Sequence, residues 1–123
     1  MKTAIKASIH GADYTCEIHR DNLKFFEAFY GPAYALLKRI SGGFWTVDEL
    51  RAVINFATKP KLDPNLTAMA VALKQSMYAE HSFIDDAFVA RGPAYYAPLA
   101  VGILTASLGG VDDELAVFSD ADA

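Results

Sequence analysis

Apolar and polar residues alternate along residues 3–19 of the chain. An alternation of period two indicates two strands that are each buried on one face. Between them, Gly11-Ala12 predicts a two-residue turn, because glycine suits the first central position of a tight hairpin turn. In the register that this turn sets, Ile9 lies opposite Tyr14, and Lys6 lies opposite Glu17 on the other face. The apolar face then consists of Ile5, Ala7, Ile9, Tyr14, Cys16 and Ile18.

After residue 20 the apolar residues recur at helical spacing. Helix-starting residues stand at Asp21, at Thr46 with Glu49 in a capping-box spacing, and at Asp63-Pro64. The fourth helix either continues or restarts before Arg91, and its expected inward stripe is Leu66, Met69, Ala70, Leu73 and Met77. The expected helices cover residues 21–30, 32–40, 46–58, 64–91 and 98–108.

These patterns predict an α+β fold in a single domain. Residues 3–19 form an N-terminal two-stranded β-hairpin, and residues 21–110 form a bundle of about five α-helices. A length of 123 residues suits one hydrophobic core. Residues 111–123, VDDELAVFSDADA, are expected to be an acidic flexible tail.

Charge is distributed unevenly along the chain, whose net charge is −4. Residues 1–61 carry nine Lys or Arg and six Asp or Glu, a balance of +3, whereas residues 62–123 carry two and nine, a balance of −7. An acidic total argues against nucleic-acid binding, which relies on clustered Lys and Arg. Halves of opposite sign suit head-to-tail contacts between copies, and two ordinary solvated faces are the alternative.

The sequence offers little that indicates a secreted or membrane protein. Cys16 is the only cysteine, so a disulfide framework is excluded. Lys6 and His10 interrupt the apolar run that a signal peptide would need. The most apolar window, residues 95–108, is shorter than the ~20 residues that span a bilayer. We therefore expect a cytoplasmic protein that binds no membrane.

One cluster of residues has the spacing of a chemical site. His81 and Asp85 are four residues apart, so on a continuous helix they share a face and could hold a metal ion, with Glu80 and Asp86 beside them. An ordinary solvated helix surface explains the same residues, and the sequence places His10 and His19 elsewhere, in the hairpin. Cys16 is expected to be a small core side chain. We expect no catalytic residues, no metal and no cofactor.

Several large apolar residues lie where they could contact a partner. The pair Phe44-Trp45 falls in the turn between two predicted helices, and Tyr95-Tyr96 falls at the start of the last one. Three more apolar residues interrupt the acidic tail. Aromatic residues at such places either fold back over the core or anchor an interface. The candidate partner-interface residues are Phe44, Trp45, Tyr95, Tyr96, Leu115, Val117 and Phe118.

The hairpin segment HGADY and the following helix LKFFEAFYG resemble the tail assembly chaperones of gene transfer agents and siphophages. The likeness continues through PAYALLKRI, SGGFWTVDELRAVI and ILTASLGG, and it covers about residues 3–110. It implies a non-enzymatic phage or prophage protein in the bacterial cytoplasm. Such a protein self-associates into a homo-oligomer and binds the tape-measure protein during tail morphogenesis, with the tail-tube protein as a further partner.

Two other functions fit the same sequence. The first is a structural phage component, such as a head–tail connector or a tube-associated protein. The second is a small metal-dependent enzyme that uses His81 and Asp85.

Overall fold

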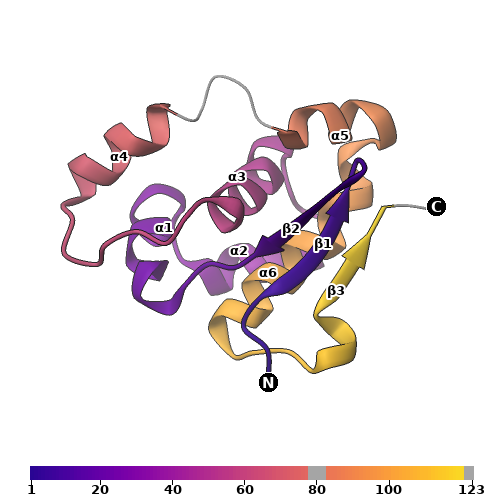
Figure 1. Cartoon of the computed structure of the whole chain (residues 1–123), viewed down its shortest axis with the longest axis horizontal. Coiled ribbons are helices and arrows are strands. Elements are labelled where there is room, and N and C mark those ends of the chain that lie inside the picture. Colours follow the sequence, from indigo (N-terminus) through magenta and orange to yellow (C-terminus); the bar gives the residue numbers. More distant parts are fainter. Residues whose placement is uncertain (78–82, 121–123) are drawn as a thin grey trace.

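The computed structural model describes residues 1–77 and 83–120, and it has the predicted α+β fold (Figure 1). Within these residues, a β-hairpin is followed by six α-helices and a third strand. The strands are β1 (Ile5–Ile9), β2 (Ala12–Cys16) and β3 (Val117–Ser119). The helices are α1 (Leu23–Tyr30), α2 (Ala33–Ser41), α3 (Val47–Thr58), α4 (Ala68–Met77), α5 (Phe83–Arg91) and α6 (Ala97–Leu108). Three short 3₁₀ helices are η1 (Arg20–Asn22), η2 (Pro93–Tyr96) and η3 (Asp113–Leu115).

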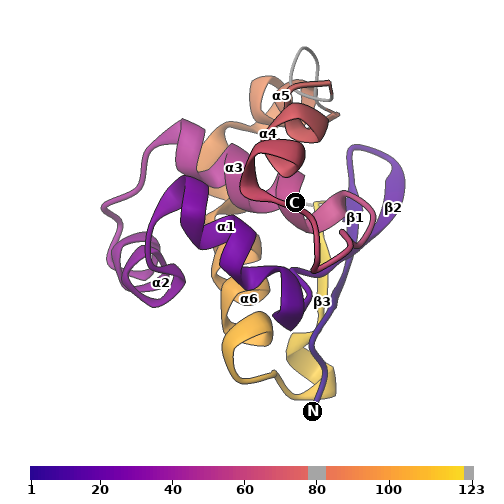
Figure 2. The ribbon, with the colours of Figure 1, turned by 90° about the vertical axis from the view of Figure 1, so that its left-hand side faces the viewer.

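The sheet is three-stranded with the order β2-β1-β3, in which β1 runs antiparallel to β2 and parallel to β3. Ile5, Ala7 and Ile9 of β1 are buried, as the alternation predicted. The helices gather on the side of the sheet to which these residues point (Figure 2). The intervening residues of β1 lie on the opposite face, which no helix covers in this view.

The hairpin register differs from the predicted one by two residues. The two central turn residues are His10 and Gly11, both with positive φ (50° and 84°), so Ile9 pairs with Ala12 instead of Tyr14. Lys6 consequently lies opposite Thr15 and not opposite Glu17. A turn with two positive φ values twists as the strands do, which favours it over the predicted turn. Because the shift is even, the apolar residues keep their face.

The helix starts were only partly predicted. Thr46 accepts a hydrogen bond from the Glu49 N–H, and the Glu49 side chain accepts one from the Thr46 N–H, which confirms the capping box of α3. Asp21 does not cap α1, and its carboxylate is instead paired with Lys61 at 3.0 Å. The fourth helix begins at Ala68 rather than after Pro64. Its first turn is capped by the Thr67 hydroxyl, which accepts the Ala70 N–H at 3.1 Å.

The prediction of a flexible tail is wrong for residues 111–120. Lys2 and Val111 exchange two backbone hydrogen bonds of 2.8 Å, and the Lys6 N–H donates to the Ala116 carbonyl at 2.9 Å. Val111 and Ala116 are buried, so this segment contributes apolar surface to the core. The edge of β1 supplies the hydrogen-bond partners that hold an otherwise acidic segment in place.

The centre of the core is α6, which packs against α2, α3 and β1. Its residues Leu99, Ile103 and Leu104 are fully or almost fully buried, in agreement with the predicted apolar core helix. Gly102 of the same helix faces Ile5 of β1. Among the described helices, none combines the length and the apolar character that crossing a membrane requires.

Candidate partner-binding surfaces

The predicted interface residues around η2 and β3 form an aromatic cluster. The ring of Tyr96 lies 5.5 Å from that of Tyr95 and 5.9 Å from that of Phe118, measured between centroids. Tyr95 and Phe118 are partly buried against the core, and Tyr96 is fully buried. In this structure Tyr96 has no exposed surface, so its ring is not offered to a partner on the surface of the single chain, contrary to the prediction. This cluster attaches β3 to the rest of the protein.

Asp120 directly follows β3 and is a buried carboxylate that sequence reasoning missed. Its side chain accepts a hydrogen bond of 2.6 Å from the Tyr96 hydroxyl and two, of 2.8 and 3.1 Å, from the backbone N–H of His10. Burial alone would raise the pKa of Asp120, but these hydrogen bonds and the charge of Arg91 hold it below its ordinary value. Burial and the neighbouring carboxylate raise the pKa of Tyr96. Asp120 thus fastens β3 to the hairpin turn and to η2.

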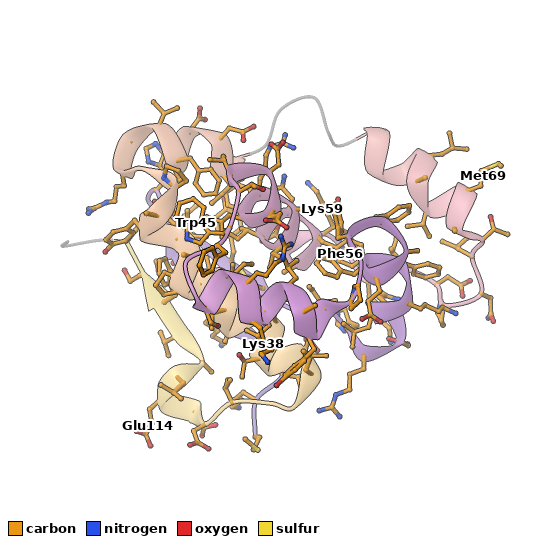
Figure 3. The ribbon with its side chains drawn as sticks, turned by 180° about the vertical axis from the view of Figure 1, so that it is seen from behind. Lys38, Trp45, Phe56, Lys59, Met69 and Glu114 are labelled. Carbon is orange, nitrogen blue, oxygen red and sulfur yellow. The ribbon has the colours of Figure 1, made fainter. Side chains whose placement is uncertain are left out.

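The pair in the turn between α2 and α3 is divided between core and solvent. Trp45 is partly buried and packs against the core (Figure 3). Of the two expected alternatives, this is the one in which the aromatic residue folds back over the core. Phe44 is 77% exposed, so its ring is available to a partner.

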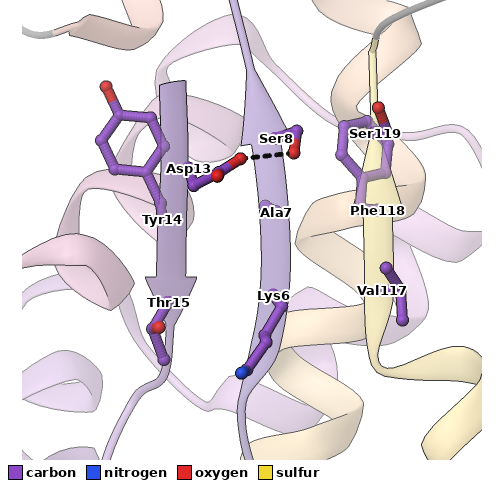
Figure 4. A pocket seen from close by; sticks show the side chains of 9 residues that line it. All are labelled: Lys6, Ala7, Ser8, Asp13, Tyr14, Thr15, Val117, Phe118 and Ser119. Atoms are coloured by element: carbon purple, nitrogen blue, oxygen red, sulfur yellow. Dashed lines mark hydrogen bonds between the residues drawn. The ribbon is translucent and has the colours of Figure 1, made fainter. Parts of the chain in front are cut away.

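Leu115 and Val117 are both exposed, near or on β3. Val117 is paired in register with Lys6, on the sheet face opposite the helices. A shallow pocket of about 420 Å³ spans all three strands at this point. Its lining mixes polar and apolar residues, and Ser8 donates a hydrogen bond of 2.7 Å to Asp13 across it (Figure 4). The pocket residues are Lys6, Ala7, Ser8, Asp13, Tyr14, Thr15, Val117, Phe118 and Ser119.

The largest departure from the sequence prediction concerns α4. Met69 is 76% exposed and Leu73 is 64% exposed, although both were expected on the inward stripe. Val71, on the other side of the helix, is fully buried instead. The helix lies beside α1 at one end of the molecule (Figure 1), and Met69 projects away from the body (Figure 3). Because α4 carries apolar residues on all sides, spacing alone could not tell which of them face inward.

The candidate chemical residues do not form a site within the described part of the chain. Asp85 accepts hydrogen bonds from the Arg51 guanidinium at 2.8 and 3.3 Å, so its carboxylate is engaged in an ion pair between α5 and α3. Glu80 and His81 lie outside the described residues. Across residues 1–77 and 83–120, no three His, Cys, Asp or Glu side chains are arranged to hold a metal ion.

The other candidates of the hairpin also have structural surroundings. His19 Nδ1 lies 3.5 Å from a Glu17 carboxylate oxygen, and His10 occupies the hairpin turn. Cys16 is fully buried, and burial raises the pKa of its thiol to about 12. A thiol of this kind is protonated at neutral pH and is a poor nucleophile. Cys16 is therefore a core side chain.

Comparison of the chain with protein-family models, with curated proteins and with solved structures found no match in any of the three.

Proposed function

We propose that this protein is a non-enzymatic tail assembly chaperone of a phage or prophage, which self-associates and binds the tape-measure protein before the tail tube forms around it. The proposal is supported by the order of hairpin, aromatic helix and short helices that the resemblance rests on. It is also supported by a surface with an apolar character that suits a helical partner.

The observation that carries the proposal is the exposed pair Met69 and Leu73 on α4. The two residues are four apart, so they form one apolar strip along the helix. A long apolar helix, such as a tape-measure protein contains, can lie along such a strip and cover it. Methionine adapts to irregular partner surfaces, because its side chain is unbranched and flexible. Burying both side chains would contribute roughly 1.5–3 kcal/mol each.

Size-exclusion chromatography with light scattering tests the proposal. The intact chain is run alone and with a helical fragment of the tape-measure protein from the same phage or prophage. We expect an oligomer in the first case and a complex of higher mass in the second. A strict monomer that ignores the fragment at high concentration would contradict the proposal.

A matched pair of variants locates the binding surface. Met69→Glu combined with Leu73→Glu places two charges on the strip, and we expect it to weaken fragment binding at least tenfold. Val89→Glu is the control, because Val89 is 88% exposed on a different helix, α5. Equal loss of binding in both variants would show that α4 is not the binding surface.

A further inference from the structure

Residues 111–120 follow α6 and lie along the edge of the sheet. We infer that this segment exchanges between two copies of the chain, so that β3 of one copy lies against β1 of the other. The inference concerns how two copies meet, and it rests on the self-association included in the proposed function. Its occupant is a second copy of this chain.

The contacts that hold the segment are concentrated on one edge of β1 and around η2. Backbone hydrogen bonds join Lys6 to Ala116 and Asp120 to Ser8, at 2.9 and 3.0 Å. The side-chain contacts are those of Phe118 with the tyrosines and of Asp120 with Tyr96 and the His10 N–H. All of these partners lie in residues 1–96, whereas the segment itself follows α6.

A second copy offers the same contacts without any new complementarity. The edge of β1 accepts the sequence 111–120, as this structure shows within one chain. The same sequence from another molecule makes identical hydrogen bonds and ring contacts, so its docking free energy is equal. Exchange of identical elements is a low-cost route to association for this reason. In the closed form, the segment docks on its own chain. This form is favoured only by the effective concentration of the tethered segment, on the order of millimolar, and by the conformation of the hinge.

The hinge is Gly109-Gly110, between α6 and the segment. Gly110 has φ +88°, and a Cβ at this position would lie 3.0 Å from the Met1 Cβ and 3.4 Å from the Lys2 carbonyl oxygen. Gly109 has a negative φ and open space where its Cβ would be. A side chain at position 110 therefore strains the closed hinge, whereas one at position 109 does not.

Substitutions at the two glycines test the hinge independently of the docking contacts. A change at Asp120 or Phe118 weakens docking equally within one chain and between two chains, so it cannot shift the balance between them. Gly110→Ala opposes the hinge conformation of the unexchanged chain through its backbone angle, φ +88°, while every docking side chain is kept. The Met1 and Lys2 atoms near its Cβ belong to the docking surface, so they are met in both forms. We therefore expect Gly110→Ala to increase exchange and Gly109→Ala to leave it unchanged.

Disulfide trapping in the intact chain detects exchange directly. Lys6 and Val117 are partners in the parallel register and both are exposed on the outer sheet face. Lys6→Cys and Val117→Cys are made in separate proteins, mixed and oxidised. A disulfide between one Lys6→Cys molecule and one Val117→Cys molecule then requires β3 of the second to lie on β1 of the first. Cys16 does not interfere, because it is fully buried.

The control replaces Val117→Cys with Leu115→Cys, which is equally exposed but is not the register partner of Lys6. We expect the mixed disulfide with Val117→Cys to exceed this background several-fold, to grow with protein concentration, and to increase further in the Gly110→Ala background. A yield equal to the Leu115→Cys background, with Gly110→Ala included, would overturn the inference.

Failure of the inference is distinguishable from failure of the proposed function. If light scattering shows an oligomer but the mixed disulfide stays at background, exchange is overturned while self-association stands. If the chain is monomeric and ignores the tape-measure fragment, the proposed function itself fails. If an unrelated strand peptide, added before oxidation, lowers the mixed-disulfide yield to background and light scattering shows no oligomer, the choice of a second copy as occupant is also overturned.

Discussion

At the scale of single residues, Asp120 is the position that sequence reasoning could least foresee. It lies in a run of acidic residues that by composition belongs in solvent, yet it is only 5% exposed. Its partners, Tyr96 and His10, are 24 and 110 residues away, so no local pattern contains the contact. Cys16 shows the opposite case, because its place in an alternating strand was sufficient to predict its burial.

Asp120 makes the stability of the protein depend on pH. Its folded-state pKa is lowered below the unfolded value of about 4, so the ionised carboxylate stabilises the fold above that pH, and this contribution is lost as the pH falls through the folded-state pKa. Asp120→Asn removes the charge, and we expect it to lower the unfolding free energy at pH 7 by about 1–3 kcal/mol. Urea denaturation at pH 7 and near pH 3 measures both effects.

The control for this prediction is Asp113→Asn, which removes the same charge from an exposed position on η3. The difference between wild type and Asp120→Asn should shrink at the lower pH, whereas Asp113→Asn should remain close to wild type throughout. A constant difference at both values would mean that packing, and not the charge, explains the loss.

At the scale of elements, a structural feature was predicted more accurately when the residues that determine it are close together in the sequence. The capping box at Thr46 involves residues three apart, and it was predicted where it occurs. The hairpin was predicted with the correct faces but the wrong register, because alternation fixes the face of a residue and leaves even shifts open. The prediction of the inward face of α4 was wrong, because that face depends on which neighbouring elements the helix contacts.

The capping box gives a measurable prediction for α3. Thr46→Ala removes the acceptor for the Glu49 N–H, and we expect the unfolding free energy to fall by about 1 kcal/mol. Thr46→Ser retains a hydroxyl at the same place and should remain within a few tenths of a kcal/mol of wild type. Chemical denaturation followed by circular dichroism distinguishes the two. Equal stability of the alanine and serine variants would show that the side-chain hydrogen bond contributes nothing.

At the scale of the whole molecule, the fold joins the two halves of opposite charge. The segment from the acidic half adds β3 beside β1 of the basic half, and Val111 pairs with Lys2. The acidic residues 112–114 therefore lie near the N-terminal lysine of the same molecule. This arrangement was not predictable, because parallel pairing between residues more than 100 positions apart has no signature in the local pattern. The two halves also meet through an ion pair within one chain, since Arg51 of the basic half lies 2.8 Å from Asp85 of the acidic half.

Self-association should consequently persist at high salt. Strand exchange and the apolar strip on α4 depend on backbone hydrogen bonds and apolar burial, which salt screens little. Stacking of oppositely charged exposed faces behaves differently. It loses most of its attraction when the Debye length falls from about 10 Å near 0.1 M salt to about 3 Å near 1 M. We expect the mass measured by light scattering to be unchanged between these two conditions. Dissociation to monomers near 1 M salt would instead assign the contact to the charged faces. Parallel trapping of the mixed disulfide between Lys6→Cys and Val117→Cys at both salt concentrations would then show whether the exchanged strand persists when those faces are screened.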